Sequence, residues 1–357
     1  MGIHRLIAYW LGAAMLAGCA APGLAPAAAE APIPMAVQAR VVLQAGSRGG
    51  DRAWNLDQIE KSGLRLQGVG RPVVVAVLDT GIDPQQPDLA GRCYPVLDVV
   101  GRDLYRHPKG TVDYTGVDGN GHGSHVAGIV ASVSAGAEVR ILPVKVIPNS
   151  GVGDDHLLST GIEQALAWRD GQDPTLRVRV MNLSVSSPQI SERLKRAIRR
   201  ATEEGVLVVG ASGNGGKAVE FPALMEEVLS VGATIPDESV ASYSSFGSAV
   251  DIAAPGGHDA TPVFSAWPSY LTSTDLDSGV AEAHTTAGLV GTSMAAPHVS
   301  ATAAVVWSLR PHLTAQQVRS GILAMALDRG AVGPDPHYGF GLLNFDRAYR
   351  GDSHDAH

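Results

Sequence analysis

Residues 291–307 read GTSMAAPHVSATAAVVW, and this stretch decides how the rest of the chain is arranged. From Met294 to Trp307 no side chain carries a fixed charge, and small residues recur at each turn, which is typical of a helix buried on most sides. With Thr292 as the N-cap, Ser293 is the first helical residue, where unpaired N–H groups and the helix dipole stabilise a nearby anion. A hydroxyl in that position is suited to be a nucleophile. The alternative is that Ser293 only caps the helix.

Pro297 falls in the first turn of this helix or just past it. Proline has no backbone N–H, so it leaves at most one helical carbonyl without its usual donor. The defect lies at the end of the helix where chemistry is expected.

The composition indicates a globular protein with a large core. The chain has 357 residues, of which 45% are hydrophobic and 17% charged, enough for one sizeable domain or two small ones. The formal net charge is -8 and no run of Lys or Arg stands out, which argues against nucleic acid as a partner.

The N-terminus is typical of an export signal. Arg5 precedes an apolar run over residues 6–15 that is too short to span a bilayer permanently, so residues 1–18 are predicted to be a signal peptide. The tetrad Leu-Ala-Gly-Cys ending at Cys19 resembles the lipobox of bacterial lipoproteins, whose cysteine becomes lipidated. This resemblance implies a lipid anchor on Cys19 and a place on the periplasmic side of the outer membrane or the cell surface. The alternative is an ordinary signal peptide that contains a cysteine.

The remaining chain divides into three parts. Residues 19–50 are rich in Ala and Pro and are interpreted as a tether, residues 51–350 as the main folded domain, and residues 351–357 as a polar tail. Residues 53–66 have helical spacing and are expected to form the first helix. If Cys19 carries lipid, Cys93 has no cysteine left to pair with, so no intrachain disulfide is expected.

Beyond residue 66, apolar runs of strand length alternate with helical patterns. The runs lack apolar–polar alternation, as in strands of a parallel sheet that is covered on both faces. Strands are predicted at residues 73–78, 141–146, 178–183, 206–211 and 228–233, and helices at residues 122–134, 154–170, 190–204, 293–310 and 314–327. The alternation predicts one α/β domain, with a mostly parallel sheet and helices on both faces.

Polar residues gather where the predicted strands and helices meet. Asp79, Ser184 and Asn214 each follow a predicted strand, at the carboxyl edge where open parallel sheets bind their ligands. His122 and Ser293 lie at predicted helix starts. Carboxylate, imidazole, hydroxyl and amide are the components of a nucleophilic acyl-transfer site.

Three motifs carry a resemblance to the subtilisin-like serine proteases. They are VAVLDTGID around Asp79, GHGSHVAG around His122 and GTSMAAPH around Ser293, in the order Asp, His, Ser that is known for subtilisin. ASGNG around Asn214 lies between the last two. The resemblance covers residues 51–349 and implies the three-layer subtilisin-like fold and a serine endopeptidase acting on proteins or peptides.

The resemblance also implies a role for each residue. His122 takes the proton of Ser293, whose oxygen attacks the scissile carbonyl; Asp79 orients the imidazole, and water hydrolyses the acyl-enzyme. Asn214 and the backbone N–H of the serine stabilise the oxyanion. Peptides of this family pair with two extended segments, which implies that Gly151, Gly153, Ser184, Val185 and Ser186 bind substrate.

Each of these residues has another interpretation. The Asp-Thr-Gly at Asp79 occurs in aspartic proteases, but that chemistry needs two carboxylates and only one such motif is present. His122 and His125 have the spacing of two metal ligands on a helix, yet no neighbouring Cys, Asp or Glu cluster completes a set. His125 and His298 are therefore expected to be packed helix residues. Asn214 alone is also typical of a turn.

The chain departs from the family pattern at three places. The segment from Val126 to Ile141 lacks the loop that carries the strong calcium site of many relatives, so that site is not expected, although Asp88 stands where a ligand would be. No cofactor and no metal-binding residue is predicted. Residues 19–50 are too short to be a folded pro-domain. Residues 255–290 are expected to be long and irregular.

The function predicted from the sequence is an exported, lipid-anchored, monomeric endopeptidase. A catalytically silent binding lipoprotein with the same fold is the rival, and an intact Asp79, His122, Asn214 and Ser293 argues against it. An esterase is the third alternative, because acyl-enzyme chemistry also accepts esters.

Overall fold

The computed structural model describes residues 31–37, 39–42, 54–61, 66 and 68–351. The signal peptide predicted at 1–18 and the lipidation site Cys19 lie outside these residues, as does most of the predicted tail. The fold is that of the unit that begins at Pro32. No helix of the described part is long and apolar enough to cross a membrane.

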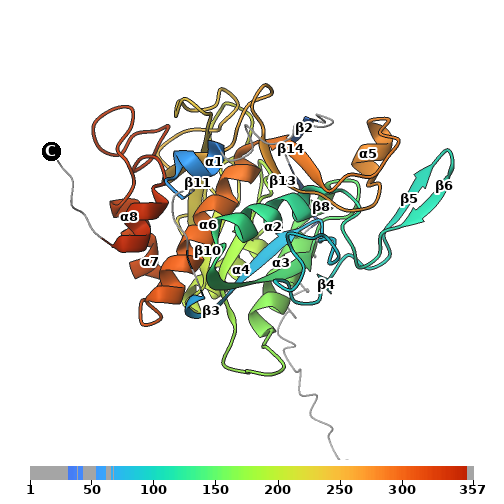
Figure 1. Ribbon diagram of the computed structural model, residues 1–357, viewed down its shortest axis with the longest axis horizontal. Coiled ribbons are helices and arrows are strands. Elements are labelled where there is room, and N and C mark those ends of the chain that lie inside the picture. Colours follow the sequence, from blue (N-terminus) through green and yellow to red (C-terminus); the bar gives the residue numbers. More distant parts are fainter. Residues whose placement is uncertain (1–30, 38, 43–53, 62–65, 67, 352–357) are drawn as a thin grey trace, which may run out of the picture. The chain divides into compact units, whose positions relative to one another are not determined.

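A seven-stranded sheet forms the centre of this unit (Figure 1). Its strands are β3 (Val69–Asp79), β4 (Leu97–Asp98), β7 (Ala137–Lys145), β9 (Val178–Leu183), β10 (Leu207–Ala211), β11 (Val228–Thr234) and β12 (Ile252–Pro255). They lie in the order β12-β11-β10-β9-β3-β7-β4, and every neighbouring pair is parallel. The parallel sheet predicted from the uninterrupted apolar runs is confirmed.

Helices cover both faces of the sheet (Figure 1). The helices are α1 (Trp54–Gln58), α2 (His122–Val133), α3 (Asp155–Ala167), α4 (Glu192–Glu203), α5 (Ser273–Asp277), α6 (Thr292–Leu309), α7 (Ala315–Ala324) and α8 (Phe345–Arg350). Helices α2 and α6 pack on one face, and α3 and α4 on the other. Successive residues of β3 enter the two cores alternately: Val73, Val75 and Val77 face α2 and α6, and Val74, Ala76 and Leu78 face α3 and α4. The predicted three-layer α/β fold is confirmed.

Seven short strands form three further sheets. They are β1 (Pro34–Ala36), β2 (Arg40–Val42), β5 (Leu104–His107), β6 (Gly110–Asp113), β8 (Val152–Asp154), β13 (Val263–Ala266) and β14 (Thr286–Val290). β1 pairs with β8, β5 pairs with β6, and β14 lies between β13 and β2. Thus β1 and β2 form inside the segment interpreted as a tether, and β13, α5 and β14 form inside the segment expected to be irregular. These four strands are stabilised by pairing with residues that are distant in sequence. Such pairing leaves no periodicity in the local sequence.

The start of α6 differs by one residue from the expectation. Gly291, rather than Thr292, is the N-cap, so Ser293 is the second helical residue and not the first. Thr292 is not needed as a cap because its N–H and hydroxyl both bind the Asn214 side chain. The first helix is also shorter than expected: α1 ends at Gln58 instead of residue 66.

Candidate active site

The candidate residues lie at the carboxyl edge of the sheet, beside β3. From β3 the chain runs through α2 to β7, which neighbours β3 on one side. It then continues through α3 to β9, which neighbours β3 on the other side. Open parallel sheets bind ligands where the strand order reverses in this way. Asp79 ends β3, while Ser184 and Asn214 follow β9 and β10.

Asp79 and His122 form a buried hydrogen-bonded pair. The distance between Asp79 Oδ1 and His122 Nδ1 is 2.8 Å, and neither residue is more than 2% exposed. Because an ionised carboxylate only accepts, Nδ1 carries a proton, and in the neutral ring Nε2 then carries the lone pair. Nε2 has no hydrogen-bond partner in the described part of the chain. The ring is thus in the tautomer that a general base requires.

Ser293 is held at the N-terminal turn of α6. Its hydroxyl donates to the backbone oxygen of Ser184 at 3.1 Å, and His122 Nε2 has no partner among the described residues, so the hydroxyl and the imidazole are not bonded to each other in this state. Catalytic hydrogen bonds often form only when substrate is bound. A rotation about the Cα–Cβ bond is the movement that would release the hydroxyl from Ser184.

Asn214 is oriented by the helix that bears Ser293. Its Oδ1 accepts hydrogen bonds from the N–H and the hydroxyl of Thr292, both at 2.8 Å. Since a backbone N–H can only donate, the atom facing it must be the oxygen, and the other end of the side-chain amide, Nδ2, is therefore a donor of fixed orientation. An oriented donor near the start of α6 is what an oxyanion hole at Ser293 would require.

Thr80 and Asp118 join the helix of His122 to the strand of Asp79, and the sequence analysis did not single them out. The Thr80 hydroxyl donates to Asp118 at 2.8 Å and accepts from the N–H of Gly123. The Asp118 carboxylate also accepts from the N–H groups of Gly121 and Ser124, at 2.8 Å each. It therefore satisfies N–H groups at the start of α2 that have no helical partner. An Asp just before a Gly-rich helix start was the available signal.

A buried ion pair lies next to Asp79 along the sheet. Lys145 is opposite Asp79 in the register of β3 and β7, and its Nζ lies 2.8 Å from Asp103 Oδ2. The ammonium also donates to the backbone oxygens of Thr80 and Val117. The pair ties the turn after Asp79 to the segment that precedes β5.

The predicted substrate-binding segments are occupied by the chain itself. β1 pairs antiparallel with β8, with Met35 opposite Gly153. On the other side, Ala36 and Ser186 exchange two backbone hydrogen bonds, of 3.2 and 3.1 Å. The Met35 side chain is buried in the same apolar cluster as Val185. The two edges that were expected to hold a peptide thus hold an extended strand between them.

His125 and His298 are packed helix residues. Burial lowers the pKa of His125 to about 3 and that of His298 to about 4. His298 Nδ1 lies 2.8 Å from the Met294 carbonyl, and its Nε2 lies 2.9 Å from the amide nitrogen of Asn55. One nitrogen donates and the other accepts, which matches a neutral ring. No group of three or more His, Cys, Asp or Glu side chains in the described ranges is arranged to hold a metal.

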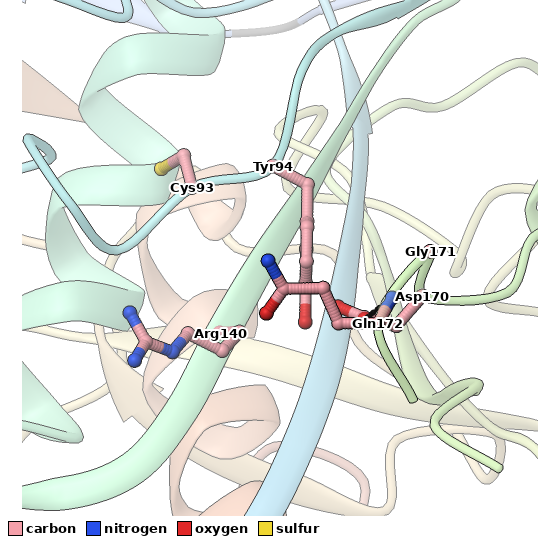
Figure 2. Close-up of a pocket in the computed structure, with 6 residues that line it drawn as sticks. All are labelled: Cys93, Tyr94, Arg140, Asp170, Gly171 and Gln172. Carbon is pink, nitrogen blue, oxygen red and sulfur yellow. Dashed lines mark hydrogen bonds between the residues drawn. The ribbon is translucent and has the colours of Figure 1, made fainter. Parts of the chain in front are cut away.

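A separate pocket of about 400 Å³ lies away from these residues (Figure 2). Arg140 lines it five residues before the end of β7, with Cys93, Tyr94 and the loop 170–172 after α3. In Figure 2 Tyr94 extends toward Asp170, while the sulfur of Cys93 is directed away from that loop. Burial raises the pKa of the Cys93 thiol to about 12, so this thiol is not a reactive nucleophile at neutral pH.

Known proteins resemble most of the chain. The sequence model of the Subtilase family matches residues 70–341. Subtilisin DY of Bacillus licheniformis is 33% identical over 304 residues, covering 82% of this chain and 94% of that protein. Subtilisin Savinase of Lederbergia lenta is 33% identical over 306 residues, covering 83% and 98%. The crystal structure of a lanthipeptide protease has a TM-score of 0.65 and 26% identity, covering 84% of this chain and 93% of that one.

Proposed function

Because this chain belongs to the subtilase family and is a subtilisin-like serine endopeptidase, we propose that it cleaves peptide bonds with Ser293 as nucleophile, His122 as base and Asp79 as orienting carboxylate. The single observation that supports these roles best is the 2.8 Å bond from Asp79 Oδ1 to His122 Nδ1, which leaves Nε2 as the acceptor. The attack, the acyl-enzyme and its hydrolysis then follow the sequence that such a triad performs.

The oxyanion is stabilised by the Nδ2 amide of Asn214 and the N–H of Ser293. The two bonds from Thr292 to Asn214 Oδ1 support this role, because they hold the amide in place before the reaction begins. A donor that is already oriented does not have to reorganise as the charge develops.

The substrate is an extended peptide that adds a strand between two edges of the enzyme. The way β1 lies between Gly153 and Ser186 supports this mode of recognition, since any peptide backbone offers the same hydrogen-bonding groups. The Met35 side chain further indicates that an apolar residue of the peptide enters the cluster around Val185.

A serine-reactive fluorophosphonate probe tests the nucleophile. We expect the folded full-length protein to be labelled on Ser293 and the Ser293→Ala variant to remain unlabelled. Mass-spectrometric mapping of peptides cut by the wild type but not by this variant shows the cleavage preference in the same experiment. If a sample with native circular dichroism is neither labelled nor active on casein, the protein is a binding protein and the proposed chemistry is wrong.

We further propose that the enzyme is exported and held at a membrane by lipid on Cys19. The apolar run at residues 6–15 and the Leu-Ala-Gly-Cys tetrad support this proposal. After expression in a bacterial host, the wild type should partition into the detergent phase of Triton X-114 and Cys19→Ser into the aqueous phase. Equal partition of the two would remove the support for an anchor.

A further inference from the structure

Pro297 leaves the nucleophile's own carbonyl without its helical donor. In an α-helix the N–H of residue 297 would bond to the C=O of residue 293, and proline has no N–H. The carbonyl of Ser293 is nevertheless satisfied, because the Ser184 hydroxyl donates to it at 2.8 Å. The bond reaches from the end of β9 to the first turn of α6.

The Ser184 hydroxyl is itself held by a chain of buried side chains. Asn182 Nδ2 donates to Ser184 Oγ at 2.9 Å, and Ser300 Oγ donates to Asn182 Oδ1 at 2.9 Å. These three side chains are 0% exposed. Since Asn182 occupies the acceptor side of the Ser184 oxygen, the hydroxyl hydrogen is directed toward Ser293.

The two serines therefore bind each other through both of their groups. The Ser184 hydroxyl donates to the carbonyl of Ser293, and the Ser293 hydroxyl donates to the carbonyl of Ser184. The first bond fixes the backbone of the nucleophile and the second holds its side chain until the reaction. The same helix start is also bound by Asn214, whose Oδ1 accepts from the N–H of Thr292.

We propose that Ser184 and Asn182 are positioning residues, which supply the nucleophile with the hydrogen bond that Pro297 withholds. This inference rests on the proposed function of Ser293 and extends it. The Ser184 side chain acts through the Ser293 backbone, so its loss displaces the nucleophile from the base and from the Asn214 amide, and removes the side-chain donor of a buried carbonyl.

The kinetic test compares Ser184→Ala in two backgrounds. In the wild-type background we expect kcat to fall about tenfold with KM little changed, because small misplacements of reacting groups slow the chemical step. In the Pro297→Ala background residue 297 regains an N–H that can reach the carbonyl. There, Ser184→Ala should change kcat by no more than about twofold.

Ser308→Ala is the matched control. It removes a buried serine hydroxyl from the same helix, one that bonds to the backbone oxygen of Arg71 at the opposite end of α6. We expect it to lower the Tm without lowering kcat. An equal loss of kcat in Ser184→Ala and Ser308→Ala would show that any weakening of the helix has this effect.

A thermal cycle tests the same bond without any activity. In the Ser293→Ala background, which keeps the backbone carbonyl and prevents self-digestion, Ser184→Ala should lower the Tm by about 3 °C. With Pro297→Ala added, the Tm drop should be at most half as large. If the drops in both kcat and Tm are the same whether or not the Pro297→Ala substitution is present, the inference is wrong. A wild type that hydrolyses nothing while the thermal coupling is present would overturn the proposed function and leave the hydrogen bond intact.

Discussion

His298 shows how a buried histidine makes stability depend on pH. Burial lowers the pKa of this ring from its ordinary value of 6.5 to about 4. Between these values the unfolded chain takes up a proton that the folded protein refuses, so stability is full above pH 6.5 and decreases as the pH falls toward 4. His125 acts in the same direction, down to about pH 3.

His298→Gln is the variant that isolates this effect. Glutamine does not titrate, so we expect the Tm of the variant to fall less between about pH 7 and about pH 4.5 than that of the wild type. Calorimetry on the Ser293→Ala background avoids self-digestion. If the Tm of the variant and that of its parent fall equally with pH, the His298 ring does not contribute to the acid sensitivity of the stability.

Asn214→Asp separates the donor of the oxyanion hole from the acceptor that holds Thr292. The substitution keeps an oxygen for Thr292 and replaces the amide that faces the oxyanion. We expect kcat to decrease about 10²- to 10³-fold, a range established on subtilisin itself. KM and the Tm should change little. A decrease in kcat of less than about tenfold would mean that other donors stabilise the oxyanion.

At the level of single residues, the sequence pointed to the candidate catalytic residues more clearly than to the residues that hold them in place. Asp79, His122 and Ser293 lie in local motifs, and in the structure Asp79 Oδ1 lies 2.8 Å from His122 Nδ1. The motif did not show that Ser293 would be bonded to Ser184. That bond depends on the packing of α6 against the end of β9, which joins residues 109 positions apart.

Among the secondary-structure elements, β1 has the clearest functional consequence. It occupies the two edges where a substrate is expected, and Met35 is buried to 1% exposure. Burial of a methionine side chain contributes about 1.5–3 kcal/mol to this docking, which is about a tenfold or greater factor in the docking equilibrium. If substrates bind between these edges as proposed, docked β1 competes with them.

Met35→Asp should release this competition, because a carboxylate is strongly disfavoured in an apolar cluster. We expect kcat/KM for a short peptide substrate to increase about tenfold, and Met35→Leu, which keeps the apolar contact, to match the wild type. A synthetic peptide of residues 31–37 should inhibit the Met35→Asp enzyme. Absence of inhibition at millimolar peptide would show that β1 does not share the substrate's site.

Elements were predictable where burial on both faces produced uninterrupted apolar runs. β9 was predicted with its observed bounds, and β3, β7, β10 and β11 within a few residues. The strands β4 and β12 at the two ends of the central sheet were not predicted, and neither were the short strands β1, β2, β13 and β14. Each is held by hydrogen bonds to a partner distant in sequence, and such pairing does not impose an alternating pattern on so few residues.

At the scale of the whole molecule, the expected absence of a strong calcium site remains a prediction. α2 ends at Val133 and β7 begins at Ala137, so the connection between them is too short to wrap an ion with about six to eight ligands. We expect EGTA to change the Tm by less than about 1 °C. A larger fall that added Ca²⁺ reverses would reveal a site elsewhere.

The parallel sheet also bears on how long the enzyme survives. Each pair of neighbouring strands joins distant parts of the chain; β3, for example, pairs Val77 with Asn182. Such a high contact order makes folding slow, because long loops must close before the pairings form. At a given stability, slower folding means slower unfolding, and the unfolding rate sets the lifetime among other proteases where cleavage outpaces refolding.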